Sequence, residues 1–516
     1  MRILVFHGYL LSGTGSNVYT ANLAAALRRA GHEVHLLSQD REPERHDFVD
    51  AVGEWRHGRL GLRTLREACR CTVYRPDIGQ VLPVYVADRY EGVEAKLFPD
   101  LRQDELDGYL CANVAAVREV AARVAPDVAL ANHLVLGPLI VTRGLDGSVP
   151  FAVKVHGSEL EYTVKPHPRF LPYVREGLDA ARVVLVGSRH TAESLWAALD
   201  DPGLPARTRL GPPGVDVEAF RPRDPEAAAA GVRRLARRLA QETPLADTGF
   251  SFARDPAAAA RAIDQLRPGE DRLVTFVGKV IVAKGIDLLL AAWPLVLEQL
   301  PQARLVIVGF GAWRAAAMRM TVALADGDLE AVHEIAEAGR GGEGGPRAAL
   351  RHLLAFLDSL GDHGRRRYLA AAVAMTERVL FTGRLTHEEL VDLLPACEAL
   401  VVPSTFPEDY GMVASEAAAC GALPVSADHS GLAEVSRLLG ATVPPEAAPW
   451  LRFGLGDEAV RDLAACLVGW LEAPETLRER TRCALVATAR ERFSWDGVAR
   501  AVIAAAQGRL DELPRA

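Results

Sequence analysis

The chain has 516 residues, which is too long for one ordinary domain and predicts two to four. With 49% hydrophobic and 24% charged residues it has the composition of a globular protein, and its formal net charge of −8 argues against broad nucleic-acid binding. No apolar run of about 18 residues predicts a transmembrane segment and no signal peptide is evident, so we expect a cytoplasmic protein with reduced cysteines.

Short hydrophobic runs that suit buried strands alternate with longer helical patterns. The first series of runs is Ile3–Phe6, Glu33–Leu37, Asp127–Ala131, Phe151–Val155 and Arg182–Val186, with a helix near Asn17–Ala30. The second series is Leu273–Val277, Arg304–Val308, Val379–Phe381, Ala399–Val402 and Leu423–Val425. This alternation predicts an α/β protein with two doubly wound parallel sheets.

Proline and glycine mark the break between the two series, at Gly211–Gly214 and Arg221–Pro225. The predicted organisation is a first domain at 1–220, a helical linker or insertion at 221–270, a second domain at 271–490 with a helical insertion at about 313–376, and a C-terminal helix at 491–516 that packs back on the first domain.

The insertion at about 313–376 contains two further motifs. Gly339–Pro346 is rich in glycine and predicts a turn between helices. Asp326 and Asp328 form an Asp-x-Asp pair that could hold a metal and a diphosphate. Helical sequence flanks this pair, however, so we interpret it as a solvated turn.

A glycine turn follows the first predicted strand. Gly13 and Gly15 would let a ligand approach the backbone at a helix N-terminus, and the alternative is a turn required only for packing. Position 18 is Val, so the Gly-x-Gly-x-x-Gly pattern of nicotinamide-cofactor sites is absent.

Polar residues end two further strands of the first domain. His156 follows Phe151–Val155, and Asn132 and His133 follow Asp127–Ala131. The carboxyl ends of strands are where open α/β sheets bind ligands. These residues are therefore either ligand contacts or hydrogen-bonded strand caps.

Two lysines follow the first strand of the second domain. Lys279 and Lys284 are five positions apart on the predicted loop. Two ammonium groups could neutralise a diphosphate without a metal. The alternative is that both are ordinary solvated lysines.

The segment Pro407–Gly421 carries the strongest signal. Glu408 lies on a loop and Glu416 on the Ala-rich helix that follows it, while Gly411 between them lets the backbone turn. The helix N-terminus suits an anion such as a diphosphate. Carboxylates are poor phosphate ligands but good acceptors for sugar hydroxyls, so the segment predicts a nucleotide-sugar site.

Residues 406–425 resemble the Glu-x7-Glu signature of the family-4 retaining glycosyltransferases, which have the GT-B fold of two Rossmann-like domains facing across a cleft. Other pieces agree in order, over most of the chain outside 226–270 and 313–376. They are the Gly13/Gly15 turn, Ala30–Val34, His156-Gly157, Pro213–Asp216, Gly278-Lys279, Lys284-Gly285, Gly383–Leu385, Ser430–Glu434 and Phe493–Trp495.

The resemblance implies a role for each matching residue. Glu408 and His156 would contact the donor sugar near the transferred carbon, and Glu416 would accept from the ribose hydroxyls. The diphosphate would be held by Lys279, Lys284 and Gly15. The backbone of Gly411, Met412 and Val413 would bind the phosphates or the sugar, and Gly383, Arg384 and Leu385 would lie near the base. Position 279 is usually Arg in the family, so Lys279 departs from the pattern.

The function implied is retaining, metal-independent transfer of a hexose-type sugar from a UDP- or GDP-sugar to a small polar acceptor, such as a natural-product or thiol-metabolite intermediate. We expect no cofactor, no nucleic-acid partner and no transmembrane segment. Whether the protein forms a homodimer is left open. Candidate acceptor contacts are Asn132, His133, Glu159 and Tyr162, together with the loop Tyr85–Gly92. The alternatives are a nucleotide-sugar 2-epimerase of the same fold and a non-catalytic nucleotide-sugar binding protein.

Overall fold

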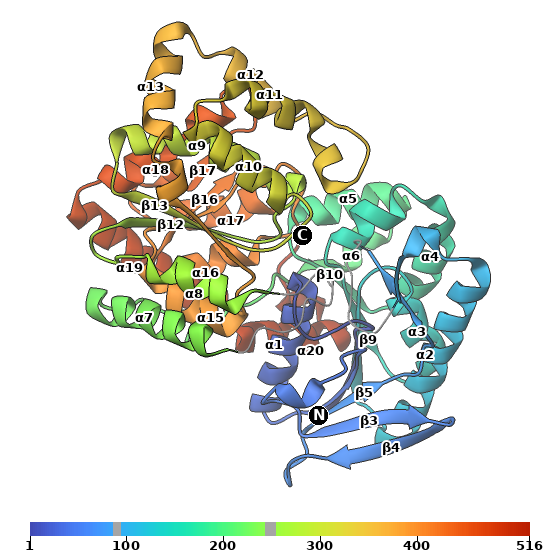
Figure 1. Ribbon diagram of the computed structural model, residues 1–516. Helices are drawn as coiled ribbons and strands as arrows, with labels where there is room; N and C mark the ends of the chain where they lie inside the picture. Colours follow the sequence, from blue (N-terminus) through green and yellow to red (C-terminus); the bar gives the residue numbers. More distant parts are fainter. Residues whose placement is uncertain (86–93, 243–253) are drawn as a thin grey trace. The chain divides into compact units, whose positions relative to one another are not determined.

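The computed structural model describes residues 1–85, 94–242 and 254–516. The chain forms two compact units, which are shown in Figure 1. Unit 1 comprises Met1–Gly214 together with Phe493–Ala516, and unit 2 comprises Val215–Arg492. Each unit has its own parallel sheet covered by helices, so the predicted α/β class with two doubly wound domains is confirmed.

The main sheet of unit 1 contains nine strands in its described part, of which only the pair β3–β4 is antiparallel. Their order is β11 (Thr208–Leu210), β10 (Val183–Val186), β9 (Phe151–Lys154), β8 (Val128–Asn132), β1 (Arg2–Phe6), β2 (Glu33–Leu37), β5 (Cys71–Arg75), β3 (Ala51–Arg56) and β4 (Arg59–Thr64). A small parallel pair, β6 (Val81–Val84) and β7 (Glu94–Leu97), lies outside it. All five predicted runs of the first series are strands, whereas β3, β4, β5 and β11 were not predicted.

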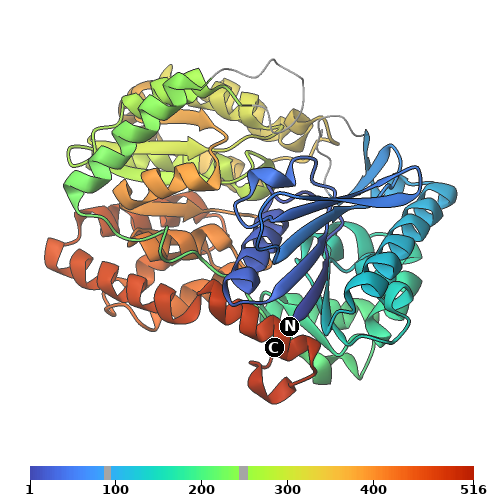
Figure 2. The same ribbon diagram turned by 90° about the horizontal axis from the view of Figure 1, so that it is seen from below.

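The helices of unit 1 are α1 (Gly15–Arg29), α2 (Gln103–Val124), α3 (Gly137–Leu145), α4 (Leu171–Asp179), α5 (Arg189–Leu199), α6 (Leu204–Arg207) and α20 (Trp495–Ala506). The last of these comes from the C-terminal end of the chain. Figure 2 shows α20, in red, beside α1, in blue, and α20 also packs on β8, β9 and β10. A Cβ on Gly214 would lie 2.7 Å from the ring of Trp495, so the glycine permits this close packing.

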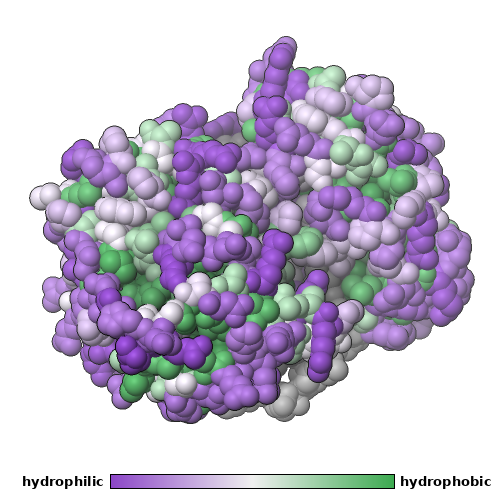
Figure 3. Space-filling model, turned by 90° about the horizontal axis from the view of Figure 1, so that it is seen from above, coloured by the Kyte–Doolittle hydropathy of each residue, from purple (hydrophilic) through white to green (hydrophobic). Residues whose placement is uncertain are grey.

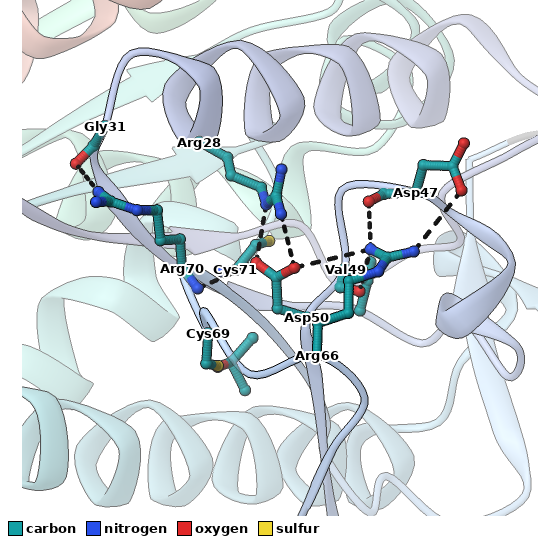
Figure 4. Close-up of polar contacts among 10 residues, drawn as sticks. Arg28, Gly31, Asp47, Val49, Asp50, Arg66, Cys69, Arg70 and Cys71 are labelled. Atoms are coloured by element: carbon teal, nitrogen blue, oxygen red, sulfur yellow. Dashed lines mark hydrogen bonds and ion pairs between the residues drawn. The ribbon is translucent and has the colours of Figure 1, made fainter.

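A buried carboxylate joins the edge strands of unit 1 to the rest of the sheet (Figure 4). Asp50 accepts two hydrogen bonds of 2.8 Å from the guanidinium of Arg28 and one of 3.0 Å from each backbone N–H of Arg70 and Cys71. Arg66 lies 3.7 Å from the second carboxylate oxygen. Burial acts to raise the pKa of Asp50, but these hydrogen bonds outweigh it and hold the pKa below its ordinary value.

The sheet of unit 2 is parallel throughout its described strands. Their order is β14 (Val379–Gly383), β13 (Ala303–Val308), β12 (Arg272–Val277), β15 (Ala399–Val402), β16 (Leu423–Ala427) and β17 (Arg452–Phe453). The chain runs outward from β12 to β14 and then returns to β15 on the other side of β12. Ligands of open α/β sheets bind where the order reverses, which here selects the loops after β12 and β15.

The helices of unit 2 are α7 (Pro225–Gln241), α8 (Pro256–Asp264), α9 (Ile286–Gln299), α10 (Arg314–Ala325), α11 (Leu329–Ala338), α12 (Arg351–Asp358), α13 (Asp362–Ala372), α14 (Met375–Arg378), α15 (His387–Leu393), α16 (Met412–Cys420), α17 (Ser430–Gly440), α18 (Ala459–Glu472) and α19 (Glu475–Arg492). The stretch 221–270, interpreted as a linker or insertion, lies within this unit, where α7 packs on α15 and α8 on β14. Helices α10 to α13 occupy the insertion at about 313–376.

The Asp326–Asp328 pair lies between α10 and α11. Asp328 accepts a hydrogen bond of 2.9 Å from the backbone N–H of Ala331 and so caps α11. Within the described ranges, no group of three or more His, Cys, Asp or Glu side chains is arranged to hold a metal ion.

Hydrophilic residues dominate the molecular face in Figure 3, and hydrophobic residues form smaller groups between them. Large exposed hydrophobic residues in the insertion include Met318, Val322 and Val373. In the part of the chain that the structure describes, no helix has both the length and the apolar character needed to cross a membrane.

Candidate functional site

Two loops meet at the point of unit 2 where the strand order reverses. Gly278–Gly285 follows β12 and Pro403–Gly411 follows β15. The backbone N–H of Thr405 donates to the carbonyl of Ala283 at 3.0 Å. Gly285 has φ +66°, and a Cβ there would lie 1.8 Å from the carbonyl oxygen of Pro403, so only glycine allows the loops to approach this closely.

Lys284 and Glu408 form an ion pair between these loops, Nζ to Oε1. Ser404 Oγ donates to the same carboxylate oxygen at 2.6 Å, and the backbone N–H of Glu408 donates to Ser430 Oγ at 3.0 Å. The side chains of Lys284 and Glu408 are 32% and 20% exposed, so both charges stay accessible to a ligand. The sequence predicts different roles for these two residues, the diphosphate for Lys284 and the donor sugar for Glu408, and the structure brings them into contact.

Gly411 begins the helix that follows the Glu408 loop. It is the N-cap of α16 with φ +91°, and a Cβ there would lie 2.4 Å from the side chain of Leu432. Met412 and Val413 are the first two helical residues, where backbone N–H groups have no partner within the helix. This end of α16 is therefore a positive site that suits an anion.

Glu416 lies one turn further along α16 and is buried, at 2% exposure. His387 Nε2 lies 3.5 Å from its carboxylate. Burial raises the pKa of Glu416, and His387 partly opposes this rise. The two glutamates therefore differ: Glu408 is partly exposed and paired with a lysine, while Glu416 is an interior acceptor.

The predicted base segment lies at the end of β14. Gly383 has φ +72° and open space where a Cβ would point, and its carbonyl accepts from the backbone N–H of Gly309 at 2.9 Å. Leu385 is buried, whereas Arg384 is partly buried. Burial lowers the pKa of Arg384, Arg254 lowers it further, and Glu389 raises it. Lys279 is partly exposed on the loop after β12.

The predicted residues of unit 1 gather at the carboxyl ends of β8 and β9, which are neighbours in the sheet. His156 Nε2 lies 3.0 Å from Asn132 Oδ1, which can only accept, so Nε2 carries the proton. Burial, with the nearby imidazole of His133 and ammonium of Lys154, lowers the pKa of His156 well below its ordinary value. The imidazole of His156 is therefore neutral at physiological pH.

His133 lies at the centre of this group. Its side chain is 4% exposed, its φ is +66°, and neither ring nitrogen has a hydrogen-bond partner among the described residues. The carboxylate of Glu159 lies 3.7 Å from Nδ1 and accepts the backbone N–H of His156 at 2.7 Å. Burial would raise the pKa of Glu159, but His133 and this N–H hold it below its ordinary value.

Sequence reasoning missed His7, whose ring stacks on His133 with centroids 5.3 Å apart. His7 Nε2 lies 2.9 Å from the carbonyl of Leu10, and burial lowers the pKa of His7 to about 3. Its position directly after the first strand was the signal available. Ser404 and Ser430, which contact Glu408, were likewise not predicted as site residues.

The remaining predicted residues have separate positions. Gly15 is the exposed first residue of α1, at the carboxyl end of β1. Tyr162 is partly buried in the π-helical segment Leu160–Val164, next to Glu159, which is fully buried. Of the acceptor loop, Tyr85 is buried against His133 with centroids 5.1 Å apart, and 86–92 lie outside the described residues.

Two family profiles match the chain. The profile described as Glycosyltransferase Family 4 matches residues 13–219, and that described as Glycosyl transferases group 1 matches residues 354–443. The first match covers most of unit 1 and the second includes the loop and helix that carry Glu408 and Glu416.

Curated relatives include two proteins named D-inositol 3-phosphate glycosyltransferase. The protein from Mycolicibacterium vanbaalenii is 27% identical over 68% of this chain, and that from Xylanimonas cellulosilytica is 26% identical over 82%. The matched regions span 64% and 77% of these relatives, so the chain spans somewhat under two thirds of the first.

Solved structures share the fold at low sequence identity. Sucrose-phosphate synthase from Thermosynechococcus elongatus superposes with a TM-score of 0.57 at 19% identity, covering 99% of this chain and 98% of that one. HepE from Anabaena, in complex with UDP and glucose, gives a TM-score of 0.55 at 16% identity, covering 99% and 100%. With the two profiles and the curated relatives, these matches show that the chain has the GT-B fold and belongs to the group 1 glycosyltransferases of family 4.

Proposed function

We propose that the protein transfers a hexose-type sugar, with retention of anomeric configuration, from a UDP- or GDP-sugar to a small polar acceptor. The donor would bind to unit 2. The observation that carries the proposal is the ion pair between Lys284 and Glu408 beside the open N-terminus of α16. A cation and a helix N-terminus suit a diphosphate, and the adjacent carboxylate suits sugar hydroxyls.

In this proposal the donor replaces the internal ion pair. The diphosphate takes the ammonium groups of Lys284 and Lys279 and the N–H groups of Met412 and Val413. Glu408 is then released to accept hydroxyls of the sugar. Glu416, which is already desolvated, accepts from the ribose. The base lies along Gly383–Leu385.

Transfer breaks the bond between the anomeric carbon and the phosphate oxygen, whose electron pair goes to the departing diphosphate. The positive groups of unit 2 stabilise this developing charge, so no divalent metal is required in the proposal. The acceptor oxygen bonds to the anomeric carbon on the same face, and its proton passes to the departing phosphate oxygen. His156, which burial holds neutral, keeps the role of donor-sugar contact that the family resemblance implies.

The acceptor would bind to unit 1. The curated relatives are named for an inositol 3-phosphate acceptor, which makes a polyol phosphate the first compound to assay. Asn132, His133 and Tyr162 are the proposed contacts, and Glu159 would position the His133 ring and the His156 backbone through its interior contacts.

The test is a transfer assay with UDP-sugars and GDP-sugars, D-inositol 3-phosphate and a panel of small polar acceptors, read by mass spectrometry. Lys284→Ala and Glu408→Gln should each reduce transfer at least about 100-fold, in line with the loss of a group that stabilises transition-state charge. Chelator should leave transfer unchanged. If both variants transfer sugar as fast as the unmodified protein, the proposed function is wrong.

The same assay separates the two alternatives. A nucleotide-sugar 2-epimerase would convert the donor when no acceptor is present, and a non-catalytic binding protein would bind nucleotide without converting any donor. The pairing of Lys284 with Glu408 beside the N-terminus of α16 favours transfer, because it sets a cation for the diphosphate next to an acceptor for sugar hydroxyls.

A further inference from the structure

The glycine-rich turn of the insertion contacts the diphosphate loop of unit 2. Gly339–Glu343, between α11 and α12, comes from a part of the chain that the family resemblance does not cover. The carboxylate Oε1 of Glu343 accepts the backbone N–H of Val282 at 2.5 Å. Val282 lies between Lys279 and Lys284, so the insertion contacts the loop that carries both lysines.

A second contact joins the insertion to the same loop. The backbone N–H of Trp313, at the start of α10, donates to the carbonyl of Val280 at 3.0 Å. A Cβ on Gly311 would lie 2.4 Å from that carbonyl oxygen, so the two segments are in close contact. The insertion therefore holds Val280 by its carbonyl and Val282 by its N–H, which fixes the direction of the loop between the lysines.

Trp313 also anchors the turn that carries Glu343. Its indole is completely buried, and Nε1 donates to the carbonyl of Gly339 at 3.3 Å. A Cβ on Gly342 would lie 3.1 Å from the indole ring. The backbone N–H of Arg340 donates to the carbonyl of Ala348 at 3.1 Å, which closes the turn. The side chain of Glu343 is 14% exposed and is therefore held in a fixed, largely desolvated position.

We propose that Glu343 is a positioning residue for donor binding, through which the insertion holds the Lys279–Lys284 loop in its diphosphate-binding conformation. This inference rests on the proposed function. A hydrogen bond from a backbone N–H to a carboxylate is charge-assisted, and losing it would leave the Val282 N–H without its acceptor. The ammonium groups would then sample more positions, and the diphosphate would bind a less ordered loop.

One competing explanation is that the Glu343 carboxylate merely occupies an N–H group that a phosphate would otherwise take. The two explanations predict opposite effects of removing the carboxylate. As a positioning group, Glu343 strengthens donor binding. As a substitute for phosphate, it weakens donor binding. The double contact at Val280 and Val282 favours the first explanation.

The test compares Glu343→Ala, Glu343→Gln and the matched control Glu334→Ala, which removes an exposed carboxylate on α11 of the same insertion. The probe is UDP or GDP, whichever the unmodified protein binds, measured by calorimetry. Glu343→Ala should weaken binding about tenfold, because one charge-assisted hydrogen bond is lost. Glu343→Gln should stay within about threefold, since its amide oxygen still accepts. Glu334→Ala should bind as the unmodified protein does.

Hydrogen exchange provides a readout that does not depend on the nucleotide. The amides of 278–285 should exchange faster in Glu343→Ala, while those of β12 and β15 should stay unchanged. If Glu343→Ala does not fold, Glu343→Asp keeps the charge but shortens the reach, and the same two effects are expected. Unchanged exchange, or nucleotide binding that is equal or tighter, would overturn the inference. Failure of the unmodified protein to bind any nucleotide would instead overturn the proposed function.

Discussion

The ammonium group of Lys284 contacts the carboxylate of Glu408 although the two residues are 124 positions apart in the chain. Both lie on loops at the point where the strand order of unit 2 reverses. Each charge therefore has a partner before any ligand binds, and a diphosphate must exchange one anion for another at Lys284. The ion pair lowers the free-energy cost of holding two charges in a partly desolvated site before the ligand binds.

Replacing Glu408 by Gln should separate nucleotide binding from turnover. The neutral amide no longer forms an ion pair with Lys284. Calorimetry should therefore show UDP or GDP binding as tight as before or a few-fold tighter. Turnover should nevertheless fall about 100-fold, because the carboxylate beside the sugar is lost. Glu446→Gln, which removes an exposed carboxylate elsewhere in unit 2, is the control. Weaker nucleotide binding by Glu408→Gln would contradict this view of the pair.

The raised pKa of Glu416 predicts a pH dependence of donor binding. A carboxylate accepts hydroxyl protons better than a carboxylic acid does, so donor affinity should fall as pH drops through the raised pKa. A nucleotide sugar is the suitable ligand, because its diphosphate has no terminal phosphate that titrates near neutrality. Glu416→Gln should flatten this profile and should weaken a ribonucleotide about tenfold. It should weaken the 2′,3′-dideoxy analogue less, and an equal loss with both ligands would argue against the ribose contact.

Gly285 should not tolerate a side chain. Its φ of +66° disfavours other residues, and a Cβ would overlap the carbonyl of Pro403. Gly285→Ala should destabilise unit 2 by about 2 kcal/mol or more and should weaken nucleotide binding. Gly269→Ala is the matched control, because Gly269 also has a positive φ, +96°, but open space around its Cβ position. Thermal unfolding should show a clearly larger loss for Gly285→Ala, and equal losses would exclude the overlap as the cause.

The buried Asp50 predicts that unit 1 loses stability in acid. Its pKa is lowered in the folded protein, so its contribution is present above the ordinary pKa of aspartate and is lost as pH falls through the folded value. Asp50→Asn should destabilise unit 1 by about 3 kcal/mol, since Arg28 loses its buried partner. Urea unfolding followed between pH 3 and 7 should show a weaker acid dependence in the variant. An unchanged dependence would assign the acid sensitivity to other carboxylates.

Asp287 at the start of α9 predicts the opposite dependence in unit 2. Burial raises its pKa to about 7, the Glu343 carboxylate adds to the rise, and Oδ1 has no hydrogen-bond partner among the described residues. Because the folded protein holds the carboxyl proton of Asp287 more tightly than the unfolded chain does, the contribution of Asp287 to the stability of unit 2 is full at low pH. It is lost as pH rises between the ordinary value and about 7.

Asp287→Asn should remove this dependence and should stabilise unit 2 above pH 7. One pKa unit corresponds to about 1.4 kcal/mol, so the gain is at most about 4 kcal/mol. Urea unfolding of the variant and the unmodified protein at pH 5 and pH 8 checks the sign. A variant that is less stable at pH 8 would show that the ionised carboxylate has a stabilising partner.

The sequence predicted most of the strands that are buried on both faces, because short runs of hydrophobic residues identify them without tertiary information. It missed β3 and β4, where Arg, Glu and Gly interrupt the pattern and the pairing with β5 decides the structure. The stretch 221–270 was interpreted as a helical linker or insertion, since an Ala- and Arg-rich helix does not reveal which unit its apolar side will contact.

The candidate site was predictable where a motif is local in the chain. The loop and helix that carry Glu408, Gly411 and Glu416 depend on neighbouring residues, and the structure forms them as expected. The pairing of Lys284 with Glu408 and the contact of Glu343 with Val282 depend on the sheet order and on the insertion. Contacts of this kind connect segments that are distant in the sequence, so no local sequence pattern predicts them.

The membership of Phe493–Ala516 in unit 1 has a consequence for biosynthesis. Helix α20 supplies buried side chains against α1 and three central strands, and the backbone N–H of Leu210 bonds to the carbonyl of Pro514 at 2.9 Å. During translation, unit 2 is synthesised whole while unit 1 still lacks a helix. Unit 1 therefore cannot finish folding until α20 has left the ribosome, and its apolar surface stays incomplete while unit 2 is being made.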